Sequence, residues 1–190
     1  MGSPQRHQRY TEKEFAALVK ASDRRLELWD GEIYDMSYTS PTHRDIVRNL
    51  IDVLRAKLKA PCAPYTGEPI RPPKTTGLYR EPDLVVLCGA RKIEAIHGLE
   101  LTTNPIVIIE VVSPDTEETD RNAKLDEYKR IVTLREYLIV AQRSAAVHQW
   151  ARRGGAWRES VAVGLQASVA MATPKVTLAL RDIYRGVAFK

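Results

Sequence analysis

A single carboxylate, Glu110, lies inside an otherwise apolar run that covers residues 106–112. Pro105 precedes the run and Ser113-Pro114 follows it, which predicts a β-strand buried on both faces. An ionised carboxylate in such a strand costs roughly several kcal/mol unless a cation or hydrogen-bond donors compensate it. We therefore expect Glu110 to be paired with a cation or to hold a metal ion. The alternative is a glutamate at the strand end that reaches solvent or a salt bridge.

A second carboxylate, Asp83, leads directly into another short apolar strand predicted over residues 83–88. If this strand pairs with the strand of Glu110, the two acids can converge near one end of the sheet. Two carboxylates at close range suit a hard cation such as Mg²⁺, which also takes water and substrate phosphate as ligands. Taken alone, Asp83 is an ordinary strand-entry aspartate, so the pairing with Glu110 is what favours a metal site.

A basic group, Lys124, falls on the helix predicted over residues 122–131. Lys124, Tyr128 and Ile131 recur at i, i+4 and i+7, so the lysine shares a helix face with expected core residues. From that face its ammonium can point toward the same carboxylates. The alternative is a surface lysine paired with Asp120, a contact that contributes only about a few tenths of a kcal/mol.

Local signals predict the elements that must position these groups. Thr11-Glu12-Lys13-Glu14 forms a capping box that begins a short helix ending near residue 20. Asp30-Gly31 lies between two alternating segments and predicts a β-hairpin. Ser40-Pro41 begins an amphipathic helix that reaches about residue 59. The remaining expectations are loops over 61–80 with at most a short strand at 68–71, a polar connection at 115–120, a strand at 137–140, a hairpin of 146–152 with 156–163, a strand at 176–180 and a helical turn at 181–185.

Strands that alternate with helices around an apolar central strand predict an α/β (α+β) fold with a mixed central β-sheet. The helices 40–59 and 122–131 are expected to cover its two faces, with a hairpin toward each end of the chain. A chain of 190 residues fits one domain, since domains commonly have about 100–200 residues. We expect that domain to cover 10–190 and residues 1–9 to form a flexible arm.

Composition limits the class of protein. The chain has 29 Lys and Arg against 24 Asp and Glu, a balance compatible with a polyanionic partner. No apolar stretch approaches the ~18 residues of a membrane span, and we expect no secretory leader. Cys62 and Cys88 have no metal-ligand spacing, so we expect free thiols in a reducing cytoplasm. Motifs of phosphate-binding loops, dinucleotide folds, zinc proteases and serine hydrolases are absent from the sequence.

Pro82-Asp83 followed by Glu110-Val111-Val112 resembles the PD-(D/E)xK motif of restriction-endonuclease-like nucleases. From about residue 10 to residue 184 the chain is similar to the Uma family of proposed bacterial endonucleases. One position departs from the superfamily pattern, because Val112 occupies the usual place of the lysine. The family resemblance assigns that role to Lys124 on the following helix. The matching stretches are 25–32, 40–43, 80–86, 109–116, 120–124 with Tyr128, and 135–140.

The resemblance implies metal-dependent hydrolysis of phosphodiester bonds, with DNA as the expected substrate. Asp83, Glu110 and the Val111 carbonyl would hold Mg²⁺, with Mn²⁺ as an alternative, to activate a water molecule and neutralise charge. Lys124 would orient that water or stabilise the transition state. A homodimer is a further expectation, because cutting both strands favours a symmetric pair of subunits.

Two more residues match the family. Glu27 is a candidate accessory catalytic acid; its alternation with Leu26 and Leu28 turns it away from their face, and the alternative is a solvated strand glutamate. His43 opens the second predicted helix and can contact a phosphate near the positive helix end; the alternative is a local cap or packing group.

Two functions from other classes remain open at this point. The first is a non-catalytic nucleic-acid-binding or interaction module that retains the nuclease fold. The second is a structural subunit in which an exposed hairpin bearing Trp150 and Trp157 mediates dimer formation.

Overall fold

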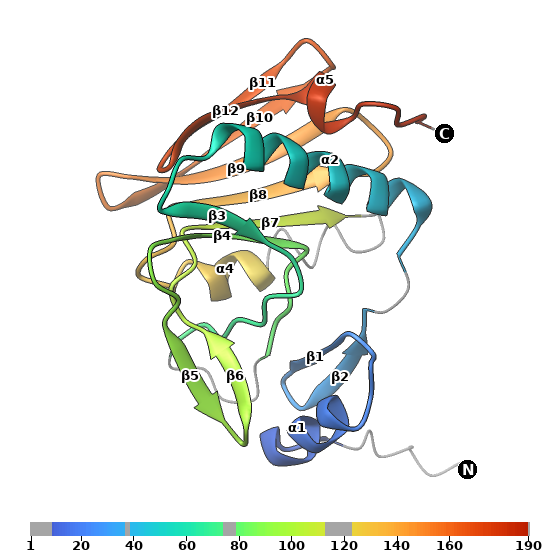
Figure 1. Cartoon of the computed structure of the whole chain (residues 1–190), viewed down its shortest axis with the longest axis vertical. Coiled ribbons are helices and arrows are strands. Elements are labelled where there is room, and N and C mark those ends of the chain that lie inside the picture. Colours follow the sequence, from blue (N-terminus) through green and yellow to red (C-terminus); the bar gives the residue numbers. More distant parts are fainter. Residues whose placement is uncertain (1–8, 37–38, 74–78, 113–122, 190) are drawn as a thin grey trace, which may run out of the picture.

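The computed structural model describes residues 9–36, 39–73, 79–112 and 123–189 of the chain (Figure 1). Its strands are β1 (Leu26–Trp29), β2 (Glu32–Asp35), β3 (Cys62–Tyr65), β4 (Leu84–Cys88), β5 (Ile93–Ile96), β6 (Leu99–Thr102), β7 (Val107–Val112), β8 (Glu136–Ala141), β9 (Ala146–Arg153), β10 (Ala156–Val163), β11 (Ser168–Ala172) and β12 (Lys175–Ala179). Its helices are α1 (Glu12–Lys20), α2 (Pro41–Lys57), α4 (Leu125–Tyr128) and α5 (Leu180–Ile183).

A six-stranded sheet of order β10-β9-β8-β7-β4-β3 forms the centre of the fold. β7 and β8 are parallel, and the other neighbours in this sheet are antiparallel, so the predicted mixed sheet is confirmed. The pairs β1-β2, β5-β6 and β11-β12 form three small separate sheets. In Figure 1 the β1-β2 and β5-β6 hairpins lie below the central sheet, while β11-β12 lies above it.

The two N-terminal helices begin at the residues that the sequence predicts. The Thr11 hydroxyl accepts from the Glu14 N–H, and the Glu14 carboxylate accepts in return from the Thr11 N–H, which completes the capping box. At α2, the Ser40 hydroxyl accepts from the His43 N–H at 3.0 Å, and Pro41 occupies the first turn. These caps fix where α2 begins, and hence where His43 lies.

Side chains that alternate along β7 divide the core into two layers. Val107, Ile109 and Val111 pack with the apolar face of α2, while Ile108 and Val112 pack with the segment around α4. The expected strand buried on both faces, with a helix over each face, is therefore confirmed. Because side chains alternate, Glu110 points to the α4 side of the sheet.

The register of the central strands brings the two predicted acids together. β4 pairs with β7 antiparallel, and Leu84 lies opposite Ile109. One step further along this register, Asp83 lies across from Glu110. The strand pairing on which the expected metal site depends is therefore present.

Several elements differ from the sequence prediction. β3 falls in the segment expected to be loops; it contains Pro64, which an edge strand tolerates because one side needs no donor. The β5-β6 hairpin was not expected, since its turn at His97-Gly98 uses positive φ angles of 49° and 77° without a typical Asn-Gly signal. β11 was also missed. The described part of the helix expected over 122–131 is shorter than predicted, and the polar connection 115–120 lies outside the described residues.

One expectation about side chains is wrong, and one open alternative loses its premise. Cys62 and Cys88 form a disulfide between β3 and β4, where the register places them directly opposite each other. The expectation of a reducing compartment, which depended on free thiols at these two positions, therefore loses its support. Trp150 is buried and stacks on Tyr137, while Trp157 packs against the same core, so Trp150 offers no exposed dimer surface. None of the helices in the described ranges is long and apolar enough to cross a membrane.

Candidate active site

The carboxylates of Asp83 and Glu110 each accept a hydrogen bond from the backbone of the strand that carries the other residue. The Val111 N–H donates to Asp83 Oδ2 at 2.8 Å, and the Asp83 N–H donates to Glu110 Oε2 at 3.4 Å. Only 5% of the Glu110 surface is exposed, so this glutamate does not reach solvent as a strand-end residue would. The strand pairing thus anchors each carboxylate on the backbone of the neighbouring strand.

Lys124 directs its ammonium to Glu110. Its Nζ lies 3.2 Å from Glu110 Oε1, and the Lys124 side chain is almost wholly buried. The geometric prediction that the lysine turns toward the carboxylates is therefore confirmed for Glu110. The alternative partner, Asp120, lies outside the described residues.

Tyr128 is a contact of Glu110 that the sequence pattern indicated only as a core residue. Its hydroxyl donates to Glu110 Oε1 at 2.9 Å, one helical turn after Lys124. Burial, reinforced by the charge of Glu110, raises the pKa of Tyr128 well above its usual value, so the hydroxyl keeps its proton. The i, i+4 spacing with Lys124 is the signal that identifies it, because both side chains then reach the same carboxylate.

Glu27 lies on the other side of the Lys124 ammonium. Its Oε2 is 3.6 Å from Lys124 Nζ and accepts from Arg80 Nη1 at 2.9 Å, while Oε1 accepts from the Glu81 N–H at 3.1 Å. Burial opposes ionisation of Glu27, but Lys124 and Arg80 outweigh it and lower the pKa of the carboxyl. The alternative of a solvated strand glutamate is wrong, because only 2% of Glu27 is exposed.

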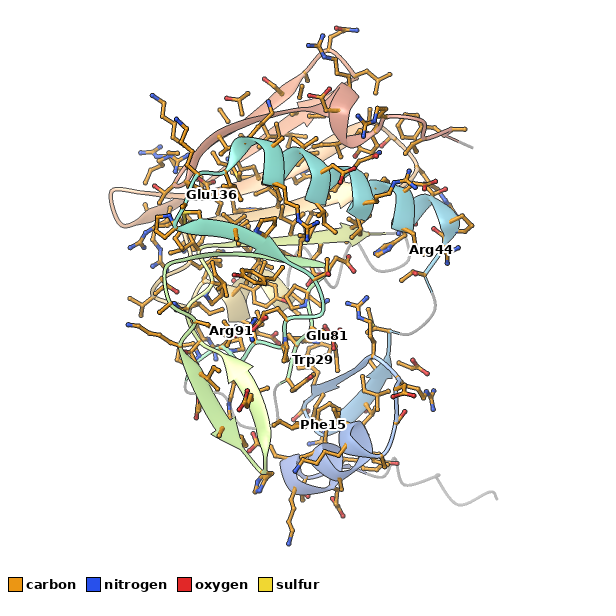
Figure 2. The ribbon with its side chains drawn as sticks, in the orientation of Figure 1. Phe15, Trp29, Arg44, Glu81, Arg91 and Glu136 are labelled. Atoms are coloured by element: carbon orange, nitrogen blue, oxygen red, sulfur yellow. A yellow bond between two sulfur atoms is a disulfide. The ribbon has the colours of Figure 1, made fainter. Side chains whose placement is uncertain are left out.

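Arg80 connects the N-terminal hairpin to the segment after β7. Besides Glu27 it holds Glu127 through Nε and Nη2, both at 3.0 Å, and its guanidinium lies 5.4 Å from the centre of the Trp29 ring. Burial disfavours its charge, yet the surrounding acids raise the pKa of Arg80 further above its usual value. Figure 2 shows Trp29 close to Glu81, where the β1-β2 hairpin meets the rest of the molecule. This buried network fixes Glu27, and through it the position of Lys124.

His43 and Arg25 contact Asp83 from its other side. His43 Nε2 lies 3.0 Å from Asp83 Oδ2, and Arg25 Nη1 lies 3.5 Å from Oδ1, while Arg25 Nε donates to Glu81 at 2.9 Å. Burial raises the pKa of Asp83, but His43, the Val111 N–H and Arg25 together lower it below the ordinary value. Among the described residues, His43 Nδ1 is buried without a hydrogen-bond partner. The contact of His43 with a phosphate, one of the two roles considered for it, stays a hypothesis.

The donor set suits Mg²⁺ better than a metal that needs an all-protein cage. Within the described ranges, no three His, Cys, Asp or Glu side chains come together as metal ligands. Two carboxylates are present, and the Val111 carbonyl accepts one bond, from Gln142 at 3.3 Å, which leaves a second lone pair. Mg²⁺ typically uses one or two carboxylates and fills its other positions with water and substrate phosphate. The residues therefore fit this ion.

A groove of about 500 Å³ opens beside Asp83. Arg25, His43, Glu81 and the exposed side of α2 line it together with Asp83. A substrate that enters this groove reaches the Asp83 carboxylate directly.

A mixed sheet with helices over both faces and paired acids at one strand end defines a restriction-endonuclease-like protein. The chain belongs to the Uma2 family, described as "Putative restriction endonuclease", whose model matches residues 12–181. It is 29% identical over 167 residues to the uncharacterized protein slr1290 of Synechocystis sp., a match that covers 86% of this chain and 85% of that protein. The resemblance to the Uma family is thus confirmed.

A solved structure has the same fold. The crystal structure of a putative nuclease belonging to DUF820 from Anabaena variabilis superposes with a TM-score of 0.74. The match covers 94% of this chain and 99% of that chain at 16% sequence identity. At this identity the likeness shows a common architecture.

Proposed function

We propose that the protein is a metal-dependent endonuclease that hydrolyses phosphodiester bonds of DNA. The observation that carries this proposal is the position of Glu110 between the other two residues: it accepts from the Asp83 N–H at 3.4 Å and lies 3.2 Å from Lys124 Nζ. Two acids and a lysine are the groups that the PD-(D/E)xK pattern requires. Family membership supports the same conclusion.

Asp83 and Glu110, with the Val111 carbonyl, are the residues that would hold Mg²⁺ or Mn²⁺. When bound, such an ion would activate a water molecule as nucleophile and offset the charge that develops on the phosphate. The lowered pKa of Asp83 keeps its carboxylate ionised at neutral pH. A scissile phosphate would reach these acids through the groove beside Asp83.

Lys124 would supply positive charge where the phosphate becomes more negative. A cation held in a buried site loses little energy to reorganisation, and removal of one such group commonly lowers the rate by about 10²–10³-fold. Glu110 and Glu27 hold the ammonium from two sides, at 3.2 and 3.6 Å. These contacts favour a positioning role for Glu27, and its direct action as an accessory acid is the second possibility.

Cleavage of a supercoiled plasmid by the purified protein tests the proposal. We expect nicking or linearisation with Mg²⁺ or Mn²⁺, and its loss in Glu110→Gln. Glu94→Gln is the matched control, because Glu94 is exposed on β5 and lies away from these residues. Glu94→Gln should cleave the plasmid as fast as the wild-type protein.

Calorimetric titration with Mn²⁺ separates this function from the non-catalytic binding module. We expect binding that Asp83→Asn weakens at least about 10-fold, since one of two carboxylate ligands is lost. A wild-type protein that neither binds Mn²⁺ nor cleaves DNA in either metal would contradict the proposal and favour the module.

A further inference from the structure

One side of α2 carries a row of arginines along the groove that ends at Asp83. Arg44, Arg48 and Arg55 all line it. Their spacing of four and seven residues places them on one helix face. Figure 2 shows Arg44 near the N-terminal end of α2, next to His43, which contacts Asp83. The row therefore starts beside the candidate active site and extends away from it.

These three guanidinium groups are available to a ligand. Arg55 makes no ion pair or hydrogen bond with any of the described residues, and Arg44 donates to a backbone carbonyl, that of Thr39, at 2.9 Å. Arg48 lies 3.1 Å from Asp45, but both side chains are largely exposed. Exposed pairs of this kind contribute about 0–1 kcal/mol and exchange readily for another anion.

Two of the three acids that line the same groove, Glu81 and Asp83, contact Arg25. The third, Asp52, lies on α2 and forms only an exposed pair with Arg185 at 3.8 Å. The side of the groove formed by α2 thus carries three arginines against one acid, a net positive charge. This distribution suits a polyanion that passes along α2 and presents one phosphate to Asp83.

The length of the row matches a nucleic-acid backbone. At 1.5 Å per residue, the eleven-residue step from Arg44 to Arg55 covers about 16 Å along the helix axis. B-DNA advances about 3.4 Å per nucleotide of each strand, so the row follows roughly five nucleotides. Side chains of this length can contact two or three phosphates over such a distance.

The groove lacks the groups that hold single strands. Proteins that bind single-stranded nucleic acid stack the bases on Phe, Tyr or Trp side chains. No such side chain is found among the described residues that line this groove. In a duplex the bases stack on each other, so contacts to the backbone are sufficient.

We propose that Arg44, Arg48 and Arg55 bind the phosphodiester backbone of one strand of duplex DNA and lead it to Asp83. This inference rests on the proposed function for the identity of the reaction, but the binding step requires no cleavage. The contacts are to phosphates alone, so binding through this row is independent of base sequence.

Fluorescence anisotropy with a labelled 20-base-pair duplex, in EDTA and over a series of salt concentrations, tests the proposal. In the variant Arg44→Gln/Arg48→Gln/Arg55→Gln we expect the slope of log K against log salt to become shallower by about 2–3, near 0.9 per lost phosphate contact. Affinity at moderate salt should fall at least about 10-fold. Glutamine has a helix propensity close to that of arginine, so α2 should stay folded, and circular dichroism verifies this.

The matched control is Arg130→Gln/Arg158→Gln/Lys175→Gln, which removes the same charge from exposed positions outside the groove. It should keep the wild-type slope. The proposal would be overturned if wild type and the α2 variant had equal salt slopes, or if both variants lost the same affinity for the duplex. Tighter binding of a single strand than of the duplex would also overturn it. Because EDTA prevents metal-dependent cleavage, these outcomes are independent of whether the plasmid assay succeeds.

Discussion

Lys124 Nζ lies 3.2 Å from Glu110 Oε1, although the two residues are 14 positions apart and belong to different elements. Each of these buried charges would be costly alone, and each is compensated by the other. Glu27 and Tyr128 complete the surroundings of this pair. The same contact that permits burial also holds an ammonium beside the carboxylates, which is what the proposed reaction needs.

The first prediction concerns Lys124→Met. Removal of the ammonium should lower plasmid cleavage by about 10²–10³-fold or more at saturating Mg²⁺. It should also destabilise the fold by about 3–5 kcal/mol, because Glu110 and Glu27 lose a buried partner. Initial rates and urea denaturation measure the two effects. Lys129→Met, which removes a lysine paired with an exposed aspartate, is the control and should change both little.

A purely structural role for Lys124 would lower stability alone. If folded Lys124→Met, assayed well below its unfolding midpoint, cleaved DNA at the wild-type rate, the assigned role would be wrong.

The second prediction concerns Tyr128→Phe. This change removes a hydrogen bond of 2.9 Å to a buried carboxylate and leaves the ring packing intact. We expect a loss of about 1.5–3 kcal/mol in the free energy of unfolding, as for hydrogen bonds to charged groups. Tyr65→Phe, at a partly exposed tyrosine on β3, should cost far less. Equal urea midpoints for the two variants would show that the Tyr128 hydroxyl contributes nothing.

The third prediction is a dependence of stability on pH that involves Glu27. Lys124 and Arg80 outweigh burial and hold the pKa of Glu27 below the ordinary value of about 4.3. The unfolded state then binds a proton more readily than the folded state. The stabilisation is present above the unfolded pKa and is lost as pH falls through the folded pKa.

Urea denaturation of wild type and Glu27→Gln between about pH 6 and pH 3 checks this prediction. The variant should be less stable at pH 6, and its stability should fall less steeply on acidification. If the free energies of unfolding of the two proteins changed in parallel with pH over the whole interval, Glu27 would titrate alike in the folded and unfolded states.

Sequence reasoning located the residues that conflict with their local pattern. Glu110 interrupts an apolar strand, and Lys124 falls on an apolar helix face, so the local pattern alone indicates that both need a partner. The pairing of the Asp83 and Glu110 strands entered the sequence argument only as a condition, and the register of β4 with β7 fulfils it. The proximity of the two acids therefore depends on local pattern and on this one pairing.

Contacts that depend on long-range register could not be predicted in this way. Arg80 follows a proline-rich segment without periodicity, so nothing local indicates a buried cation beside Glu27. Tyr128 has the spacing of an ordinary core residue, and only the direction of its hydroxyl shows the hydrogen bond. His43 contacts Asp83 across 40 positions of sequence, which required the placement of α2 over β4.

The last prediction concerns the disulfide that the sequence pattern did not indicate. Cys62 and Cys88 are 26 positions apart, and their pairing depends on the register of an edge strand that was itself missed. A cross-link that closes a loop of this size stabilises a protein by about 2–4 kcal/mol, because it restricts the unfolded chain. We expect Cys62→Ser/Cys88→Ser, or the reduced wild type, to unfold at correspondingly lower urea. Intact mass under non-reducing conditions should be lower than that of the reduced protein by two hydrogen atoms. Detection of free thiols in the folded protein under non-reducing conditions would contradict the cross-link and show that both cysteines are reduced.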